Sequence, residues 1–344
     1  MYGRLILFLL VVAVVVAGAL ALRALRWADS PAVPPELHPP SQIVFIPDGT
    51  NFQQIAALLE EARLIKSRTR FVMLGRNNGA DRRIISGEYE LNPSLTPREI
   101  LAKLTAGQVV LHAITIPEGY TIAQIGELLD VEKLVNPEEF VRLARDPEFI
   151  RTLRIGAPTL EGYLFPDTYR VSRGTKAKDL IRVMVEKLWQ TLTPALREQM
   201  ERRQMTLHET LTLASVIEKE TSVGEERRLI SAVFHNRLKR QIPLQSDPTV
   251  IYGLEEFDGN IRKKDLSSAS PYNTYRVRGL PPGPIASPGA EAIAAALNPA
   301  DASYLYFVSR NDGTHEFSST LTQHNEAVER YQKRPFRRLA RPHA

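Results

Sequence analysis

One carboxylate, Glu218, lies in an unusually apolar stretch of predicted helix, LASVIEKET at 213–221. At about 100° per residue, it falls close to the stripe of Leu207, Leu211 and Ala214, which should face the core. Burial disfavours the ionised form of a carboxyl group, and the negative end of a helix dipole acts in the same direction. Glu218 is therefore a candidate general acid that stays protonated near neutral pH.

Local signals bound the helix that carries Glu218. Thr206 and Glu209 form a capping box that begins this helix, and Ser222 with Glu225 is expected to begin the next one. Glu218 is therefore expected in a last helical turn, next to the unpaired carbonyl groups of the helix end.

Polar and aromatic side chains crowd the loops of the second half of the chain. The motifs are EGYLFPDTY at 161–169, LQSDPT at 244–249, SPYNTY at 270–275 and GLPPGPI at 279–285. Sugar rings present apolar faces for stacking and hydroxyls for amides and carboxylates, so these loops favour a sugar cleft. The candidate substrate-binding residues are Glu161, Asp167, Tyr169, Gln245, Asp247, Tyr272 and Asn273. Asp and Asn also brace turns, which is the alternative role for each polar residue.

A glycan cleft with one protonated Glu is compatible with two reactions. A glycoside hydrolase normally needs a second carboxylate, as nucleophile or to activate water. A lytic transglycosylase does not, because the 6-hydroxyl of N-acetylmuramic acid attacks the anomeric carbon and one carboxyl handles both protons. Glu161, Asp167 and Asp247 are available as second carboxylates, and Asp167 or Asp247 is expected to hold Glu218 by hydrogen bonding. The number of acids alone does not separate the two reactions.

Composition and missing motifs exclude several other classes of site. The chain of 344 residues has no cysteine, which excludes disulfides and thiolate metal sites. Phosphate-binding glycine loops and the HExxH and GxSxG signatures are absent. The histidines have no ligand spacing, so neither a metal nor a cofactor is expected. The aromatics accompany carboxylates and amides rather than a basic face, so no nucleic-acid partner is expected.

The beginning of the chain predicts a membrane anchor over residues 1–27. Residues 5–22 form an uninterrupted apolar run, long enough to span a bilayer, with arginine on both sides. The alternative is a cleavable signal peptide, because small residues at 17–21 resemble a cleavage site. The length of the run favours the anchor. We expect a single-pass protein of the inner membrane, with the bulk of the chain on the periplasmic side.

An internal repeat occupies the first predicted domain, residues 43–150. FIPDGTNFQQIAALL at 45–59 returns as TIPEGYTIAQIGELL at 115–129. Each copy predicts a strand, a turn and a capped helix, an order that resembles the first half of a LysM module. That resemblance implies a glycan-binding or glycan-positioning role for residues 43–112. The alternative is a strand–helix unit that only packs.

The predicted fold class is α+β. The chain is predicted to comprise the transmembrane helix, a Pro-rich linker at 28–42, the small LysM-like domain at 43–150, a larger mixed catalytic domain with long loops at 151–332 and a basic tail at 333–344.

The anchor, the repeat, EGYLFPDTY at 161–169, ASVIEKET at 214–221 and the three later loop motifs, in this order, resemble the bacterial YceG-like family over nearly the whole chain. The resemblance implies an endolytic murein transglycosylase that cuts nascent peptidoglycan strands and leaves 1,6-anhydro-N-acetylmuramic ends. It assigns the role of general acid and base to Glu218. It also implies that the enzyme terminates glycan elongation and works near penicillin-binding proteins or other glycan polymerases.

Several alternatives stay open at this point. Glu218 could be a half-exposed residue at a helix end, paired with Lys219 or Arg227. The protein could be a muramidase-type hydrolase, or a non-catalytic scaffold that binds peptidoglycan and recruits polymerases. A pyridoxal-phosphate lyase with Lys219 as its amine is a further alternative, which an aldimine absorbance would reveal.

Overall fold

This computed structural model describes residues 2–333, apart from the side chains of residues 2–7, 24 and 25. The described chain combines helices with three two-stranded sheets, which confirms the predicted α+β class. It divides into two compact units. Unit 1 is Met1–Ala113 with Arg170–Thr175, and unit 2 is Ile114–Tyr169 with Lys176–Ala344. The predicted tail beyond Lys333 lies outside the described residues.

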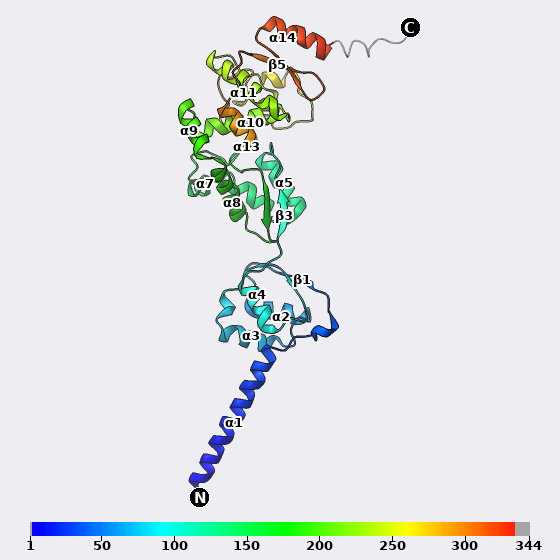
Figure 1. The fold of residues 1–344 in the computed structure, drawn as a ribbon, viewed down its shortest axis with the longest axis vertical. Coiled ribbons are helices and arrows are strands. Elements are labelled where there is room, and N and C mark those ends of the chain that lie inside the picture. The colour runs from blue at the N-terminus through cyan, green and yellow to red at the C-terminus, as the bar shows by residue number, and fades with distance from the viewer. Residues whose placement is uncertain (1, 334–344) are drawn as a thin grey trace, which may run out of the picture. The chain divides into compact units, whose positions relative to one another are not determined.

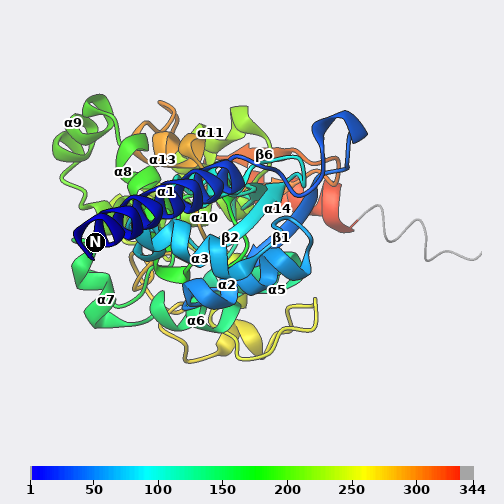
Figure 2. The same ribbon diagram turned by 90° about the horizontal axis from the view of Figure 1, so that it is seen from below.

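Unit 1 begins with a long helix and continues as a small mixed unit (Figure 1). Its elements in chain order are α1 (Tyr2–Ala28), a 3-10 turn (Pro35–Leu37), β1 (Gln42–Ile46), α2 (Phe52–Glu61), α3 (Arg68–Asn77), a 3-10 turn (Ala80–Arg82), β2 (Gly87–Leu91) and α4 (Pro97–Thr105). Strands β1 and β2 pair antiparallel and lie side by side in Figure 2, with Val44 opposite Tyr89. Within α1, Phe8–Ala28 is long and apolar enough to cross a membrane, a test that a signal sequence also passes.

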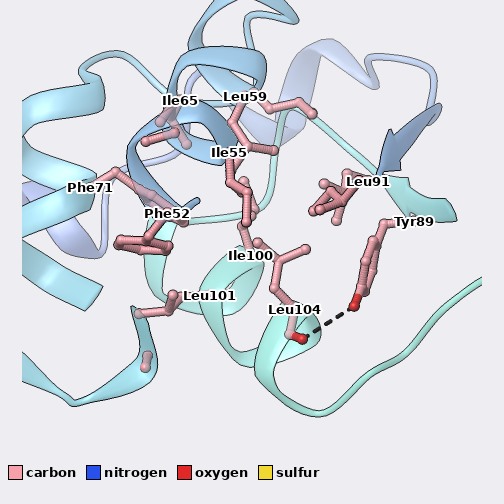
Figure 3. Close-up of a cluster of buried hydrophobic side chains, with 14 of the residues drawn as sticks. Phe52, Ile55, Leu59, Ile65, Phe71, Tyr89, Leu91, Ile100, Leu101 and Leu104 are labelled. Carbon is pink, nitrogen blue, oxygen red and sulfur yellow. Dashed lines mark hydrogen bonds between the residues drawn. The ribbon is translucent and has the colours of Figure 1, made fainter. Parts of the chain in front are cut away.

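The core of unit 1 gathers around two aromatic side chains of α2 and α3 (Figure 3). The rings of Phe52 and Phe71 stack with their centroids 5.6 Å apart. Tyr89 is fully buried and its hydroxyl donates to the carbonyls of Ile85, at 2.6 Å, and Leu104, at 3.2 Å. Burial raises the pKa of Tyr89 to about 12, so this phenol remains a neutral donor.

Strands β3 (His112–Thr115) and β4 (Thr168–Val171) form the second sheet, where the chain passes from unit 1 to unit 2 and back. The return segment is fixed to unit 1 by a buried carboxylate. Glu88 accepts from Arg173 Nε at 3.1 Å and contacts His112 Nε2 at 2.6 Å. These contacts explain why Arg170–Thr175 belongs with the first half of the chain, which local sequence patterns did not reveal.

Unit 2 contains the predicted helices of the second half of the chain and most of the loops. Its helices are α5 (Ile122–Glu132), α6 (Pro137–Leu143), α7 (Pro147–Thr152), α8 (Ala177–Thr191), α9 (Pro194–Arg203), α10 (Leu207–Glu220), α11 (Gly224–Lys239), α12 (Asp247–Tyr252), a 3-10 turn (Asp265–Ser267), α13 (Ala290–Leu297), α14 (Leu321–Val328) and a π-helical turn (Glu329–Lys333). Strands β5 (Tyr306–Ser309) and β6 (His315–Ser318) pair antiparallel. Helix α10 packs against both α11 and α13 (Figure 1).

The compact units divide the chain differently from the predicted boundary at 150. The second copy of the repeat lies in unit 2, together with the helix that carries Glu218. Both copies nevertheless begin their helices as predicted, with capping boxes at Asn51 and Thr121. The functional division into a LysM-like domain and a catalytic domain stays a prediction.

One predicted helix start is wrong. Val223, not Ser222, is the N-cap of α11, and no side chain caps it. The preceding Thr221 makes the side-chain hydrogen bonds of this turn instead. Its Oγ1 accepts from the Val223 N–H at 3.0 Å and donates to Glu226 Oε2 at 3.4 Å. Ser222 is left exposed.

Candidate functional site

Helix α10 fixes the position of Glu218. The predicted capping box is present, with Thr206 accepting from the Glu209 N–H and Glu209 accepting from the Thr206 N–H. Every residue from Thr210 to Ile217 is buried, so the helix runs through the core of unit 2. The Glu218 side chain, at its last turn, is only 7% exposed. The burial that the apolar pattern predicted is therefore present.

The surroundings of Glu218 are more polar than the sequence indicated. Its Oε2 accepts from the Gly289 N–H at 2.9 Å, and Gly289 is the N-cap of α13. Its Oε1 accepts from Arg227 Nη2 at 3.4 Å. The structure thus combines the two readings of Glu218, which is both buried and paired with Arg227. Lys219 instead donates to the carbonyl of Gly119 at 3.2 Å.

The turn of the second repeat copy lies against Glu218. Gly119 donates its N–H to the Ser287 carbonyl, and Ser287 donates to the Tyr120 carbonyl, each at 2.8 Å. These bonds join the turn to the segment that precedes α13. A Cβ added at Gly119 would lie 3.8 Å from Glu218 Cγ. The repeat therefore supplies one wall of the site.

A second acidic residue, Glu118, comes with this turn. Its Oε2 lies 3.8 Å from Arg227 Nη2, and Arg227 Nη1 also pairs with Glu291 Oε2 at 2.6 Å. Desolvation, followed by the charge of Glu218, raises the pKa of Glu118. Glu118 is not among the residues predicted from the sequence, because the pattern of the repeat does not indicate which groups its turn will contact.

Another carboxylate, that of the partly buried Glu220, lies two residues after Glu218. It accepts from Ser246 Oγ at 2.5 Å. Burial raises the pKa of Glu220 to about 7, with Asp247 contributing in the same direction and the Ser246 hydrogen bond opposing it. At about 100° per residue, Glu218 and Glu220 leave the helix in different directions. The end of α10 thus presents two separate acids.

Glu161 is a further buried carboxylate of unit 2. It accepts from the Ile122 N–H at 3.1 Å and from the Tyr252 hydroxyl at 3.2 Å. Burial raises the pKa of Glu161 to about 7. Tyr272 stacks its ring at a tilt on Tyr252, with centroids 4.8 Å apart. Two predicted cleft residues, Glu161 and Tyr272, are therefore brought together through Tyr252. The charge of Arg145 also acts on Glu161.

The remaining predicted residues have defined structural partners. Asp167 pairs with Lys187 at 2.7 Å, and that hydrogen bond lowers the pKa of Asp167. The Tyr169 hydroxyl donates to the Phe165 carbonyl at 2.5 Å. The prediction that Asp167 holds Glu218 is therefore wrong, because Lys187 takes its carboxylate.

The loop residues around α12 follow the same pattern. Asp247 accepts from the Tyr275 hydroxyl at 2.6 Å, so it does not hold Glu218 either. Gln245 is exposed and accepts from Arg237 Nη1 at 3.1 Å through its side-chain oxygen. Asn273 is fully buried and donates to two loop carbonyls, at 3.0 and 2.9 Å. Asn273 thus braces a turn.

Two further features bear on ligands. A surface cavity of about 1000 Å³ runs along α5, α6 and α7 and is lined in part by Arg145. Within residues 2–333, no group of three or more His, Cys, Asp or Glu side chains is arranged to hold a metal ion. The groups around Glu218 are the Arg227 guanidinium, the Gly289 N–H and the Glu118 carboxylate.

The raised pKa of Glu220 gives an expected pH dependence of stability. Its pKa rises from about 4.5 unfolded to about 7 folded, so the native state binds the proton more tightly. The stability that the folded protein gains from this protonation is present below pH 4.5 and is lost as pH rises through about 7. Glu220→Gln keeps an oxygen for Ser246 but does not titrate. We expect its free energy of unfolding, relative to wild type, to rise by on the order of 2 kcal/mol between pH 5 and pH 8.

Urea unfolding of both proteins at the two pH values measures this difference. Glu198→Gln serves as the control, because it removes one carboxylate of the same type from an exposed position on α9. If the free energy of unfolding of Glu220→Gln relative to wild type were the same at pH 5 and pH 8, folding would not raise the pKa of Glu220.

Comparison with known proteins gives a consistent result. The YceG-like family matches residues 44–330. A Bacillus subtilis protein named endolytic murein transglycosylase is 35% identical over 302 residues, covering 83% of each chain. A Streptococcus pneumoniae protein of the same name is 33% identical over 83% of this chain and 57% of its own. The crystal structure of a YceG-like protein from Listeria monocytogenes is 34% identical, with a TM-score of 0.59, over 83% of this chain and 98% of that one.

Proposed function

The chain belongs to the YceG-like family, and we propose that it cleaves peptidoglycan glycan strands internally as a lytic transglycosylase, with Glu218 as general acid and base. As a family member it is a murein transglycosylase, in line with the names of its relatives. The observation that carries the assignment of the residue is the position of Glu218. It is nearly buried at the end of α10 and is fixed by Arg227 and the N-cap of α13.

The proposed reaction breaks the bond between C1 of N-acetylmuramic acid and O4 of N-acetylglucosamine. Glu218 donates a proton to the departing O4, while the 6-hydroxyl oxygen of the same muramic acid bonds to C1. The proton released from that hydroxyl returns to the Glu218 carboxylate. No water is consumed, and the products are a 1,6-anhydro end and a free 4-hydroxyl. Fixed donors around a single carboxyl suit this exchange, because the group must not move between the two transfers.

Membrane location and partners extend the proposal. Helix α1 fits a single-pass anchor in the inner membrane, with the remaining chain on the periplasmic side. An anchored enzyme of this kind would act on nascent strands and end their elongation near penicillin-binding proteins or other glycan polymerases. The order β1–α2–α3–β2 in unit 1 is the basis for proposing that this LysM-like part positions the glycan.

Mass spectrometry of muropeptides tests the reaction. Full-length protein in detergent is incubated with isolated peptidoglycan, and the released fragments are examined for their ends. We expect 1,6-anhydromuramic ends. Internal cleavage should first give long fragments, whereas cutting from the strand ends would give disaccharides from the start.

A muramidase-type hydrolase is the second candidate, because the structure places an additional carboxylate, Glu118, beside the same Arg227 as Glu218. Two carboxyl groups are what a hydrolase uses to activate water or to form a glycosyl intermediate. Reducing ends in the mass spectra would establish this reaction and reject the transglycosylase.

A further inference from the structure

Four charged side chains meet where the second repeat turn contacts α10, α11 and α13. Arg227 Nη2 lies 3.4 Å from Glu218 Oε1 and 3.8 Å from Glu118 Oε2, and its Nη1 lies 2.6 Å from Glu291 Oε2. Arg227 is nearly buried, and its Nε has no hydrogen-bond partner among the described residues. Three carboxylates thus share one guanidinium, so full ionisation would leave excess negative charge.

Gly289 brings two of these carboxylates together. Its N–H donates to Glu218, and a Cβ in place of its hydrogen would overlap the Glu118 carboxylate. The absence of a side chain at Gly289 is therefore what lets Glu118 approach. Since φ is −76° here, the backbone itself does not require glycine. Close approach of Glu118 is the better explanation for glycine at this position.

The surroundings of Glu118 favour retention of a proton at this cluster. Desolvation and the charge of Glu218 raise the pKa of Glu118, Arg227 opposes them, and Glu291 adds to the rise. Interacting groups titrate as a pair, so Glu118 and Glu218 together disfavour full ionisation. Lys219 also faces the turn, but its Nζ is directed to the Gly119 carbonyl.

We propose that Glu118 is a positioning residue of the active site: beside Gly289 it forms a carboxylate pair with Glu218, and this pair keeps one proton in the reacting enzyme. This inference rests on the proposed role of Glu218. The proton that reaches the leaving oxygen comes from Glu218 and returns to it, as in the reaction above. Glu118 acts through Glu218.

The pH dependence of cleavage tests this role. Activity should fall as pH rises and the pair loses its proton, which defines the basic limb of the kcat/KM profile. In Glu118→Gln the neighbouring charge is gone, so we expect the limb to move to lower pH by about one unit. Activity should therefore fall about tenfold at pH 8 and remain within about twofold of wild type at pH 5.

Three further variants separate charge from structure. Gly289→Ala should displace the Glu118 carboxylate without changing any charge, and should move the limb in the same direction. Glu291→Gln should move it less, because that side chain is 73% exposed and screened by solvent. Glu198→Gln should not move it, since α9 contacts the opposite end of α13, about 12 Å from Gly289.

The outcomes that would overturn the proposal are specific. An unchanged limb in both Glu118→Gln and Gly289→Ala would reject it, and so would an equal loss of activity at every pH. Cleavage is measured as total released saccharide, so this test does not depend on whether the new ends are anhydro or reducing. The type of end, determined by mass spectrometry, tests the proposed transglycosylase reaction independently.

Urea unfolding adds a readout that does not depend on cleavage. The raised pKa of Glu118 means that wild type loses stability relative to Glu118→Gln as pH rises from 5 to 8. A constant difference over this range would also reject the proposal.

Discussion

Replacing Glu218 by Gln should reduce glycan cleavage by about a thousandfold or more, because the amide has no proton to donate and cannot take one back. That loss corresponds to about 4 kcal/mol of transition-state stabilisation. The substitution preserves shape, and the amide oxygen still accepts from the Gly289 N–H. The rate of release of anhydro ends from isolated peptidoglycan measures the effect.

Retained folding is part of this expected result. Arg227 keeps Glu291 and Glu118 as partners in Glu218→Gln, so the free energy of unfolding should stay within about 1 kcal/mol of wild type. Circular dichroism and thermal unfolding check this, with Glu198→Gln as a variant that loses one exposed carboxylate of the same type. A fully active, folded Glu218→Gln protein would mean that another carboxyl, Glu118 first among them, donates the proton.

The features that sequence could predict are those set by neighbours along the chain. The capping boxes at Thr121 and Thr206 need only the residue three positions later, and both formed. The burial of Glu218 followed from helical periodicity, because α10 is apolar along nearly its whole length. The failure at Ser222 was also local, since the adjacent Thr221 offered a competing hydroxyl.

The features that sequence missed depend on residues far apart along the chain. Glu118 and Gly289 lie far apart along the chain of unit 2, and no sequence pattern around either residue predicts that they come into contact. The predicted hydrogen bonds from Asp167 and Asp247 to Glu218 were wrong for the same reason. Lys187 and Tyr275 lay closer to these carboxylates, and a cation or hydroxyl close by satisfies them. Site geometry therefore had to come from the structure.

Arg237→Met should destabilise unit 2 by about 3 to 5 kcal/mol, the range found when one partner of a buried polar network is removed. The Arg237 side chain on α11 is nearly buried. Its Nε donates to the Leu305 carbonyl at 2.6 Å, and Nη1 donates to the Pro243 and Leu244 carbonyls at 3.1 and 2.9 Å. Met fills similar space but leaves these acceptors without a donor. Calorimetric unfolding of the full chain measures the loss.

The same substitution should also weaken cleavage, because the guanidinium holds the loop that leads into α12. Nη1 reaches Gln245, whose φ of 54° is a conformation that needs such support. Arg228→Met provides the matched control on α11. That exposed side chain donates one hydrogen bond within residues 2–333, to the Asn298 carbonyl, and its loss should cost under about 1 kcal/mol. Equal destabilisation by the two variants would show that α11 tolerates the loss of Arg237 and that the loop is held by other contacts. A large difference, with activity falling only in Arg237→Met, would tie the loop at Gln245 to glycan cleavage through one buried cation.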